Sequence, residues 1–156
     1  MFLTESIKPN FDTPEDLLEW MKKNLKYGTT SHGAYTSTKE ILEKKKATCW
    51  GAADFEMEYL NKMGYDTKII FVYLGDPPRK THTFTIFKKN DKWYWFEWAW
   101  GSNEGIHGPF NSNEELRDFV INKWGKFDMH YTHDSKIGRE GISDQKFLKN
   151  AGYGKL

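Results

Sequence analysis

The sequence lacks the features that mark secreted and membrane proteins. It has a single cysteine, so no disulfide can form within the chain, and we expect a reducing compartment, the cytoplasm. No stretch approaches the roughly 18 consecutive apolar residues that a transmembrane helix needs. Residues 1–11 also lack the basic segment and apolar run of a signal peptide. We therefore expect no membrane partner.

A strong charge of either sign is also absent. The formal net charge is +1 over 156 residues, which gives no global attraction to nucleic acid, so no nucleic-acid partner is expected. His130 and His133 could bind a metal together with His107, but no cysteine or well-placed acid completes a set of ligands. We expect no cofactor and no metal.

Repeats, linkers and low-complexity segments are missing too. The length fits one domain covering residues 1–156, which is large enough to bury a core without disulfides. The polar, glycine-containing stretch 127–156 fits either an ordered wrap or a loosely packed C-terminal extension. The oligomeric state is left open by the sequence.

The first half of the chain contains helix signals. Three helices are expected, at residues 14–25, 37–46 and about 49–63, and in the first and third of them apolar residues recur at helical spacing. The first two follow N-cap signals, a threonine before a proline and a serine three residues before a glutamate. Gly28 and Gly64 are the expected C-terminal stops of the first and third helices.

The second half contains strand signals. Segments 68–74, 81–87 and 93–98 are rich in β-branched and aromatic residues and read as strands. Residues 102–108 hold two glycines and read as a loop, and a second serine–glutamate capping box at Ser112 opens a last helix. Helices followed by an antiparallel meander predict an α+β fold, with N-terminal helices packed on an antiparallel sheet.

The second and third strands form a hairpin that places two polar residues together. If Asn90-Asp91 is a two-residue turn, facing residues have numbers that sum to 181. His82 and Glu97 then lie on one face as diagonal neighbours, roughly 7–8 Å apart. A glutamate side chain can span that distance to an imidazole. A slip of one residue would separate the two side chains.

Cys49 stands just before an apolar helical repeat, so it is expected near a helix N-terminus. The helix dipole and unpaired N–H groups favour a thiolate there and can stabilise an oxyanion. A lone cysteine is more often a small buried hydrophobe. His82 as a proton acceptor and Glu97 as its orienting carboxylate complete a set of residues suited to nucleophilic catalysis.

These residues resemble the core of the transglutaminase-like superfamily. That family begins a helix with Cys-Trp, as in Cys49-Trp50-Gly51-Ala52-Ala53, after a helix such as that at residues 37–46. His82-Thr83-Phe84 resembles its His-x-aromatic strand, and Phe96-Glu97 resembles the strand that carries its acidic residue. The resemblance covers about residues 14–100.

The resemblance implies a transglutaminase-like or papain-like core with three catalytic positions. Cys49 would be the nucleophile, His82 the general base and acid, and Glu97 the residue that orients His82. Two positions depart from the family pattern: Ala47 stands where glycine is usual, and Glu97 where aspartate is usual. Clustered acids of a calcium site are not evident, so a calcium-dependent enzyme is not implied.

The expected function is therefore a cysteine-dependent hydrolase or acyl transferase. It would act on an amide or peptide bond, or on a glutamine carboxamide, of a protein or peptide through a Cys49 thioester. Two alternatives stay open. One is a peptidoglycan amidase of the Cys-His-acid type, and the other is a non-catalytic binding module that keeps the fold.

Overall fold

The computed structural model describes residues 8–30, 36–73, 81–124, 128–132 and 154–155. Four α-helices, a short 3₁₀ helix (η1) and eight strands lie in these ranges. Their bounds in chain order are α1 Pro14–Asn24, β1 Lys26–Tyr27, α2 Thr38–Lys44, β2 Lys46–Ala47, α3 Cys49–Lys62, β3 Asp66–Tyr73, β4 Thr81–Lys89, β5 Lys92–Glu97, η1 Gly101–Asn103, β6 Gly105–Phe110, α4 Asn113–Trp124, β7 Asp128–Thr132 and β8 Gly154–Lys155.

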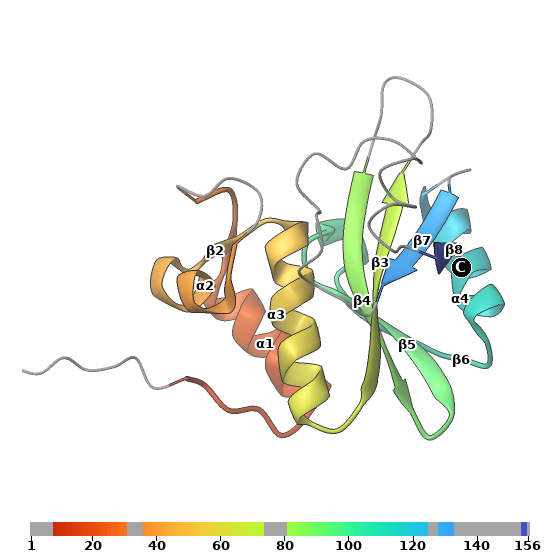
Figure 1. Cartoon of the computed structure of the whole chain (residues 1–156), viewed down its shortest axis with the longest axis horizontal. Helices are drawn as coiled ribbons and strands as arrows, with labels where there is room; N and C mark the ends of the chain where they lie inside the picture. The colour runs from red at the N-terminus through yellow and green to blue at the C-terminus, as the bar shows by residue number, and fades with distance from the viewer. Residues whose placement is uncertain (1–7, 31–35, 74–80, 125–127, 133–153, 156) are drawn as a thin grey trace, which may run out of the picture.

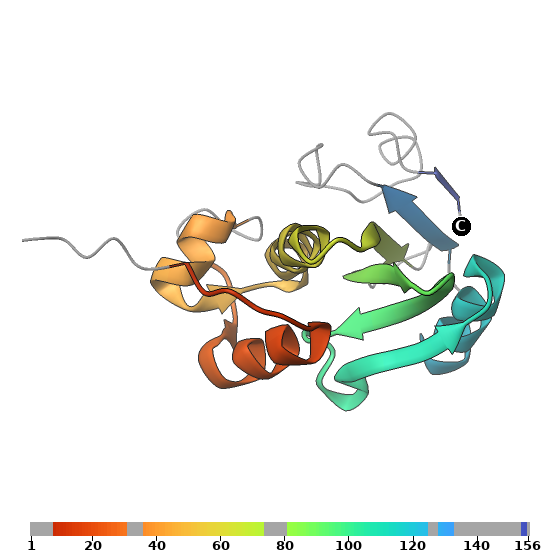
Figure 2. The same ribbon diagram turned by 90° about the horizontal axis from the view of Figure 1, so that it is seen from below.

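The elements form layers around one antiparallel sheet. Helices α1, α2 and α3 lie on one side of the sheet, with α3 nearest to it, and α4 lies on the other side (Figures 1 and 2). The sheet has six strands in the order β6-β5-β4-β3-β7-β8, and every neighbouring pair is antiparallel. The predicted α+β class, with N-terminal helices packed on an antiparallel sheet, is confirmed.

The hairpin of β4 and β5 has the predicted register. Lys89 faces Lys92 and Thr85 faces Phe96, so facing numbers sum to 181. Asn90 and Asp91 have φ angles of 52° and 61°. Two consecutive positive φ values are the mark of a type I′ turn, whose twist matches the flanking strands.

Helix α3 is placed by both of its ends and by the sheet. It begins at Cys49 after the N-cap residue Thr48. At its other end Gly64 has φ 95°, its N–H donates to the Asn61 carbonyl, and the N–H of Tyr65 donates to the Leu60 carbonyl. This is a Schellman motif, so the predicted helix and its stop at Gly64 are both confirmed.

The apolar side of α3 packs on β3 and β4. Ala53 and Met57 form a buried cluster with Ile69 of β3, and the Thr85 hydroxyl of β4 donates to the Ala53 carbonyl at 2.9 Å. The helix is therefore held on the sheet by packing and by a hydrogen bond to its own backbone.

The end of α1 differs from the sequence expectation. The helix ends at Asn24 instead of continuing toward Gly28, because Leu25 takes an extended conformation while its N–H still bonds the Met21 carbonyl. Residues Lys26–Tyr27 then pair in parallel with Lys46–Ala47. This β1–β2 pair was not predicted, since two-residue strands carry no periodicity.

The segment at residues 102–108, which the sequence predicts as a loop, also differs from that prediction. It contains η1 and the start of β6, which pairs with β5 through an irregular register. Gly105 and Gly108 both have positive φ angles. Glycines inside a segment normally indicate an interruption of a strand, so β6 was not predicted. Farther along, β7 pairs with β3, and residues 133–153 of the expected extension lie outside the described residues.

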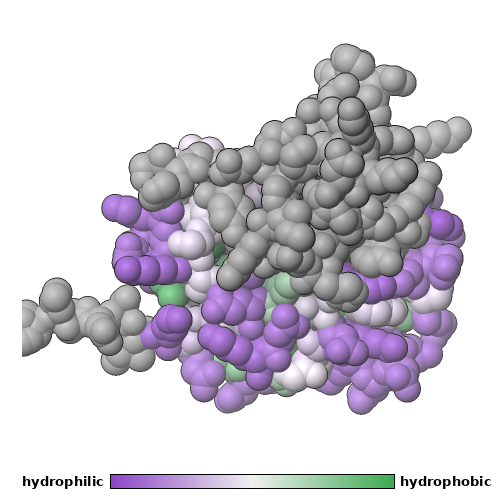
Figure 3. Space-filling model, viewed as in Figure 1, coloured by the Kyte–Doolittle hydropathy of each residue, from purple (hydrophilic) through white to green (hydrophobic). Residues whose placement is uncertain are grey.

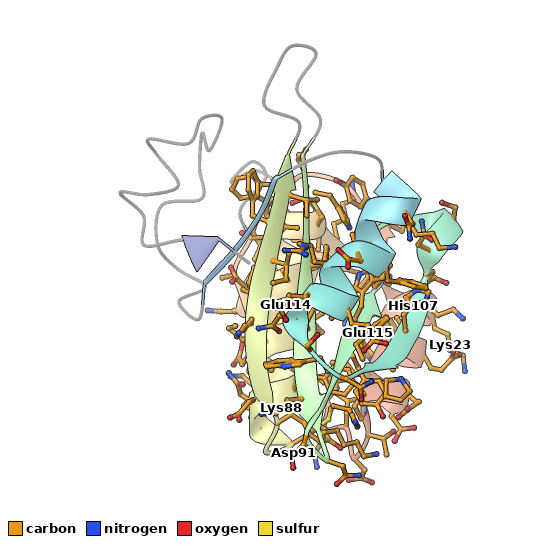
Figure 4. All side chains as sticks on the ribbon, turned by 90° about the vertical axis from the view of Figure 1, so that its right-hand side faces the viewer. Lys23, Lys88, Asp91, His107, Glu114 and Glu115 are labelled. Carbon is orange, nitrogen blue, oxygen red and sulfur yellow. The ribbon has the colours of Figure 1, made fainter. Side chains whose placement is uncertain are left out.

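Aromatic side chains fill the sheet from both faces. Trp95 packs with Phe84 and α4 residues in one buried cluster, whereas Phe96 and Trp98 pack with α1 and α3 in the other. Figure 4 shows α4 lying across the sheet beside His107, with Asp91 at the far tip of the hairpin. The run of tryptophans therefore builds core on both sides of β5.

Candidate active site

Cys49 lies at the first turn of α3, where the helix meets the end of the sheet. Its side chain is buried, with 6% exposed, and β2 immediately precedes it. Ala47, at the position where the family usually has glycine, is fully buried and accepts a hydrogen bond from the N–H of Gly28. The backbone that leads into the nucleophile candidate is thus held by a hydrogen bond from Gly28.

His82 and Glu97 are joined directly. His82 Nε2 lies 2.6 Å from Glu97 Oε1, and the two side chains are 8% and 1% exposed. The imidazole also contacts the rings of Phe84 and Trp100, with centroid distances of 5.8 Å to each. These aromatic neighbours restrict the ring orientation, so the Nε2–carboxylate contact is held in place.

The Glu97 carboxylate accepts hydrogen bonds at both oxygens. Oε1 accepts from Trp95 Nε1 at 3.2 Å in addition to the contact with His82. Oε2 accepts from the backbone N–H groups of Ala99 and Trp100, both at 3.0 Å. A buried carboxylate is stable only when its lone pairs are used in this way, so the site is built to hold a charge at Glu97.

His82 joins Glu97 to Cys49. A hydrogen bond with Cys49 contributes to the proton affinity of its ring. Because Nε2 contacts Glu97, the ring nitrogen left for the thiol is Nδ1. The structure therefore brings together all three residues that the sequence analysis selected.

The charges and hydrogen bonds around His82 favour its protonated form, the imidazolium. Burial by itself lowers the pKa of His82, but the Glu97 carboxylate and the hydrogen bonds with Cys49 and Glu97 outweigh burial and raise this pKa to about 10. A protonated ring between two acceptors is the arrangement of a thiolate–imidazolium pair.

Tyr27 is a site residue that sequence reasoning missed. Its hydroxyl lies 3.9 Å from Cys49 Sγ, and its ring stacks on Trp98 at 6.3 Å. The side chain is 60% exposed, although its hydroxyl end lies against the thiol. Burial of that end, together with Cys49, raises the pKa of Tyr27 to about 12, so the hydroxyl keeps its proton.

Glu56 is a second residue that sequence reasoning missed. It lies seven residues after Cys49 on α3, is 2% exposed, and its Oε2 has no hydrogen-bond partner among the described residues. Burial and then the charge of Glu97 raise the pKa of Glu56 well above its usual range. The i, i+7 spacing from Cys49 is the signal that could have found it.

Two neighbours act on Glu56 in the opposite direction. A hydrogen bond with Thr85 and the charge of His82 both lower the pKa of Glu56, but burial and the charge of Glu97 outweigh them. The Thr85 hydroxyl also donates to the Ala53 carbonyl.

Comparison with known proteins fits this geometry. The family model of the transglutaminase-like superfamily matches residues 2–100, which include all the site residues described above. The chain belongs to the transglutaminase-like superfamily. No curated protein matches the chain significantly.

In this transglutaminase-like chain the family match ends before β6 and α4.

The sequence analysis weighed His107 as a metal ligand. Its Nε2 contacts the Asn103 carbonyl at 2.6 Å, and His133 lies outside the described residues. In the described ranges no group of three or more His, Cys, Asp or Glu side chains could hold a metal ion. Within those ranges, too, no helix is long and apolar enough to cross a membrane.

Proposed function

We propose that the protein is a cysteine-dependent hydrolase or acyl transferase that acts on an amide or peptide bond, or a glutamine carboxamide, of a protein or peptide. The observation that carries this proposal is the position of His82, which contacts the Glu97 carboxylate at 2.6 Å and hydrogen-bonds Cys49. A structural cysteine at a helix end needs neither partner. The row of thiol, imidazole and carboxylate matches the general requirement for an activated nucleophile.

The reaction proceeds in two halves. The Cys49 thiolate attacks the carbonyl carbon and forms a C–S bond, and the His82 imidazolium donates its proton to the leaving amine as the C–N bond breaks. His82 is then neutral and takes a proton from water, whose oxygen attacks the thioester and restores the thiolate. An amine in place of water yields a new amide instead of an acid.

Glu97 orients His82 through both halves of the reaction. Its carboxylate holds Nε2, so Nδ1 faces the sulfur, and it stabilises the positive ring. Since Glu97 is fixed by two backbone N–H groups, its position does not depend on the imidazole.

Tyr27 supplies a donor for the oxyanion. Its hydroxyl lies next to Cys49 Sγ and stays protonated, as a donor to developing negative charge requires. The first N–H groups of α3 offer further donors. The exposed ring of Tyr27 places this donor where a substrate can reach it.

A single thiol as nucleophile requires that the thiol stay reduced, so a reducing compartment such as the cytoplasm suits this chemistry.

The test of the proposed nucleophile uses the fact that Cys49 is the chain's only cysteine. Alkylation of the folded protein by iodoacetamide at neutral pH should be faster than that of the unfolded chain, and His82→Ala should remove the advantage.

Catalysis is then measured as ammonia or amine release from glutamine-containing peptides and from purified cell walls. Cys49→Ala should abolish release while the melting temperature stays nearly unchanged. Turnover that survives Cys49→Ala would reject the mechanism. Release from cell walls alone would favour the amidase alternative, and a Cys49 that reacts no faster than an unfolded thiol would favour a binding module.

A further inference from the structure

Three consecutive lysines, Lys44 to Lys46, run from the end of α2 toward Cys49 and have different surroundings. Lys45 takes the left-handed conformation that ends the helix, and its ammonium lies 5.0 Å from the centre of the Trp20 ring. Lys44, the last residue of α2, and Lys46 on β2 instead line one hollow. The lysine run is therefore more than a solvated helix end.

Lys44 and Lys46 share a hollow of about 370 Å³ with Thr29 and Thr30. Ammonium groups and threonine hydroxyls are hydrogen-bond donors, so the lining suits an anion. Segments 26–30 and 43–47, which frame the hollow, contain four lysines and one acid, Glu43. Hydrophilic side chains lie over α2 at the left of Figure 3.

Both walls of the hollow are joined to the candidate active site by short stretches of chain. Lys46 precedes Cys49 by three residues, so their Cα atoms are at most roughly 11 Å apart. Thr29 follows Tyr27 by two residues, and the Tyr27 hydroxyl contacts Cys49 Sγ. The Gly28 N–H bonds the Ala47 carbonyl and fixes the two walls to each other. A peptide with its carbonyl at Cys49 can reach the hollow within a few residues.

We propose that the hollow of Thr29, Thr30, Lys44 and Lys46 is a substrate subsite that selects an anionic side chain near the reacting carbonyl. This proposal rests on the proposed function and names its substrate class, an acidic peptide. The lysines act on binding and encounter rather than on the chemical step, because they lie beside the nucleophile and not among its contacts.

The test compares peptide chloromethyl ketones that alkylate Cys49 and differ at one residue, carrying glutamate, glutamine or phosphoserine two or three positions from the reactive group. The wild-type protein should react about threefold to tenfold faster with the glutamate probe than with the glutamine probe, as expected for exposed ion pairs. The preference should shrink at high salt. A faster phosphoserine probe would assign the subsite to phosphorylated peptides, whereas a slower one would assign it to carboxylates.

The decisive variant is the double substitution Lys44→Glu and Lys46→Glu, which should reverse the preference between the glutamate and glutamine probes. The matched control is Lys39→Glu with Lys89→Glu, two exposed lysines outside the hollow, which changes the net charge equally and should keep the wild-type preference.

The outcomes separate the two proposals. Equal rates for all probes, or equal effects of the two double variants, would overturn the subsite but leave the nucleophile in place. Failure of every probe to alkylate Cys49, with iodoacetamide equally slow, would reject the proposed function itself.

Discussion

Two buried glutamates, Glu97 and Glu56, lie close to His82 but have opposite hydrogen-bonding environments. Glu97, on β5, has hydrogen-bond donors at both oxygens, two of them backbone N–H groups. Glu56, on α3, bonds only the Thr85 hydroxyl, and its Oε2 has no partner in the described part of the chain. The two side chains are about equally buried, so burial alone does not decide their charge.

The difference shows what keeps a carboxyl ionised in a protein interior. Desolvation disfavours the charged form of both groups, and only hydrogen bonds to the carboxylate or a nearby cation can offset it. Glu97 has both, because the His82 ring carries the positive charge. At Glu56, burial and the repulsion of Glu97 outweigh the Thr85 hydrogen bond and the His82 charge, so the pKa of Glu56 is raised well above its usual range. One acid can therefore stabilise an imidazolium, while the other is a neutral neighbour.

Glu97→Gln should have the largest effect. The amide oxygen can still accept from the N–H groups of Ala99 and Trp100, which leaves its NH₂ facing His82 Nε2. His82 then presents an unprotonated Nε2 and carries its proton on the nitrogen that faces Cys49, which is the wrong tautomer for a base. We expect a loss of turnover on the order of a hundredfold or more, by analogy with a triad aspartate.

Turnover and unfolding of Glu97→Gln are measured on one preparation, together with the pH profile of Cys49 alkylation. Intact turnover with lowered stability would mean that Glu97 only satisfies hydrogen bonds in the aromatic layer. A flattened pH profile with the fold retained would support its role on His82.

Much of this site could be predicted because short-range rules govern it. The turn at Asn90-Asp91 sets the hairpin register, and that register alone brings His82 to Glu97. The start of α3 at Cys49 follows from the apolar repeat after it. The family resemblance supplied the remaining step, since no local pattern in the sequence says that the helix packs at this end of the sheet.

The residues that escaped prediction depend on tertiary contacts. Tyr27 reaches Cys49 only because α1 ends early and a two-residue strand pairs with β2. Glu56 reads as an ordinary polar position until α3 is packed against Thr85. Strand β6 was not predicted because Gly105 and Gly108 are typical of a loop. Both have positive φ angles in the strand.

Glu56→Gln should stabilise the protein at neutral and alkaline pH. In the unfolded chain Glu56 ionises near pH 4.3, whereas its folded pKa is raised, so the folded state binds the extra proton. Stability is therefore lost as pH rises from the unfolded pKa toward the folded one, by about 1.4 kcal/mol per pH unit. We expect the variant to gain several kcal/mol at pH 8 and almost nothing at pH 4.5.

Denaturant unfolding of the wild type and the variant across this range measures the difference. His82 also weakens the fold as pH rises from 6.5 toward its pKa of about 10, but that contribution is shared by both proteins and cancels. Glu58→Gln is the matched control on the same helix, because Glu58 is partly exposed and pairs with Lys62. If the difference in free energy of unfolding between wild type and Glu56→Gln stays constant across this pH range, Glu56 is ionised in the folded state.

Glu97→Asp should have a smaller effect than Glu97→Gln. The aspartate keeps the charge, but its arm is one methylene shorter, so it cannot reach His82 Nε2 and the N–H groups of Ala99 and Trp100 together. We expect turnover to fall about tenfold, in keeping with the sensitivity of catalysis to small misplacements. Wild-type turnover in this variant would show that the backbone adjusts and that the longer arm is not required.

Glu56→Gln should have the smallest effect of all on the reactivity of Cys49. A neutral acid and an amide have nearly the same shape and carry no charge, so iodoacetamide should alkylate Cys49 at pH 7 within about twofold of the wild-type rate. If Glu56 instead carried a negative charge beside the thiolate, its removal would relieve a repulsion inside a weakly screened interior. Alkylation would then become several times faster in the variant, and the contrast between the two glutamates would fail.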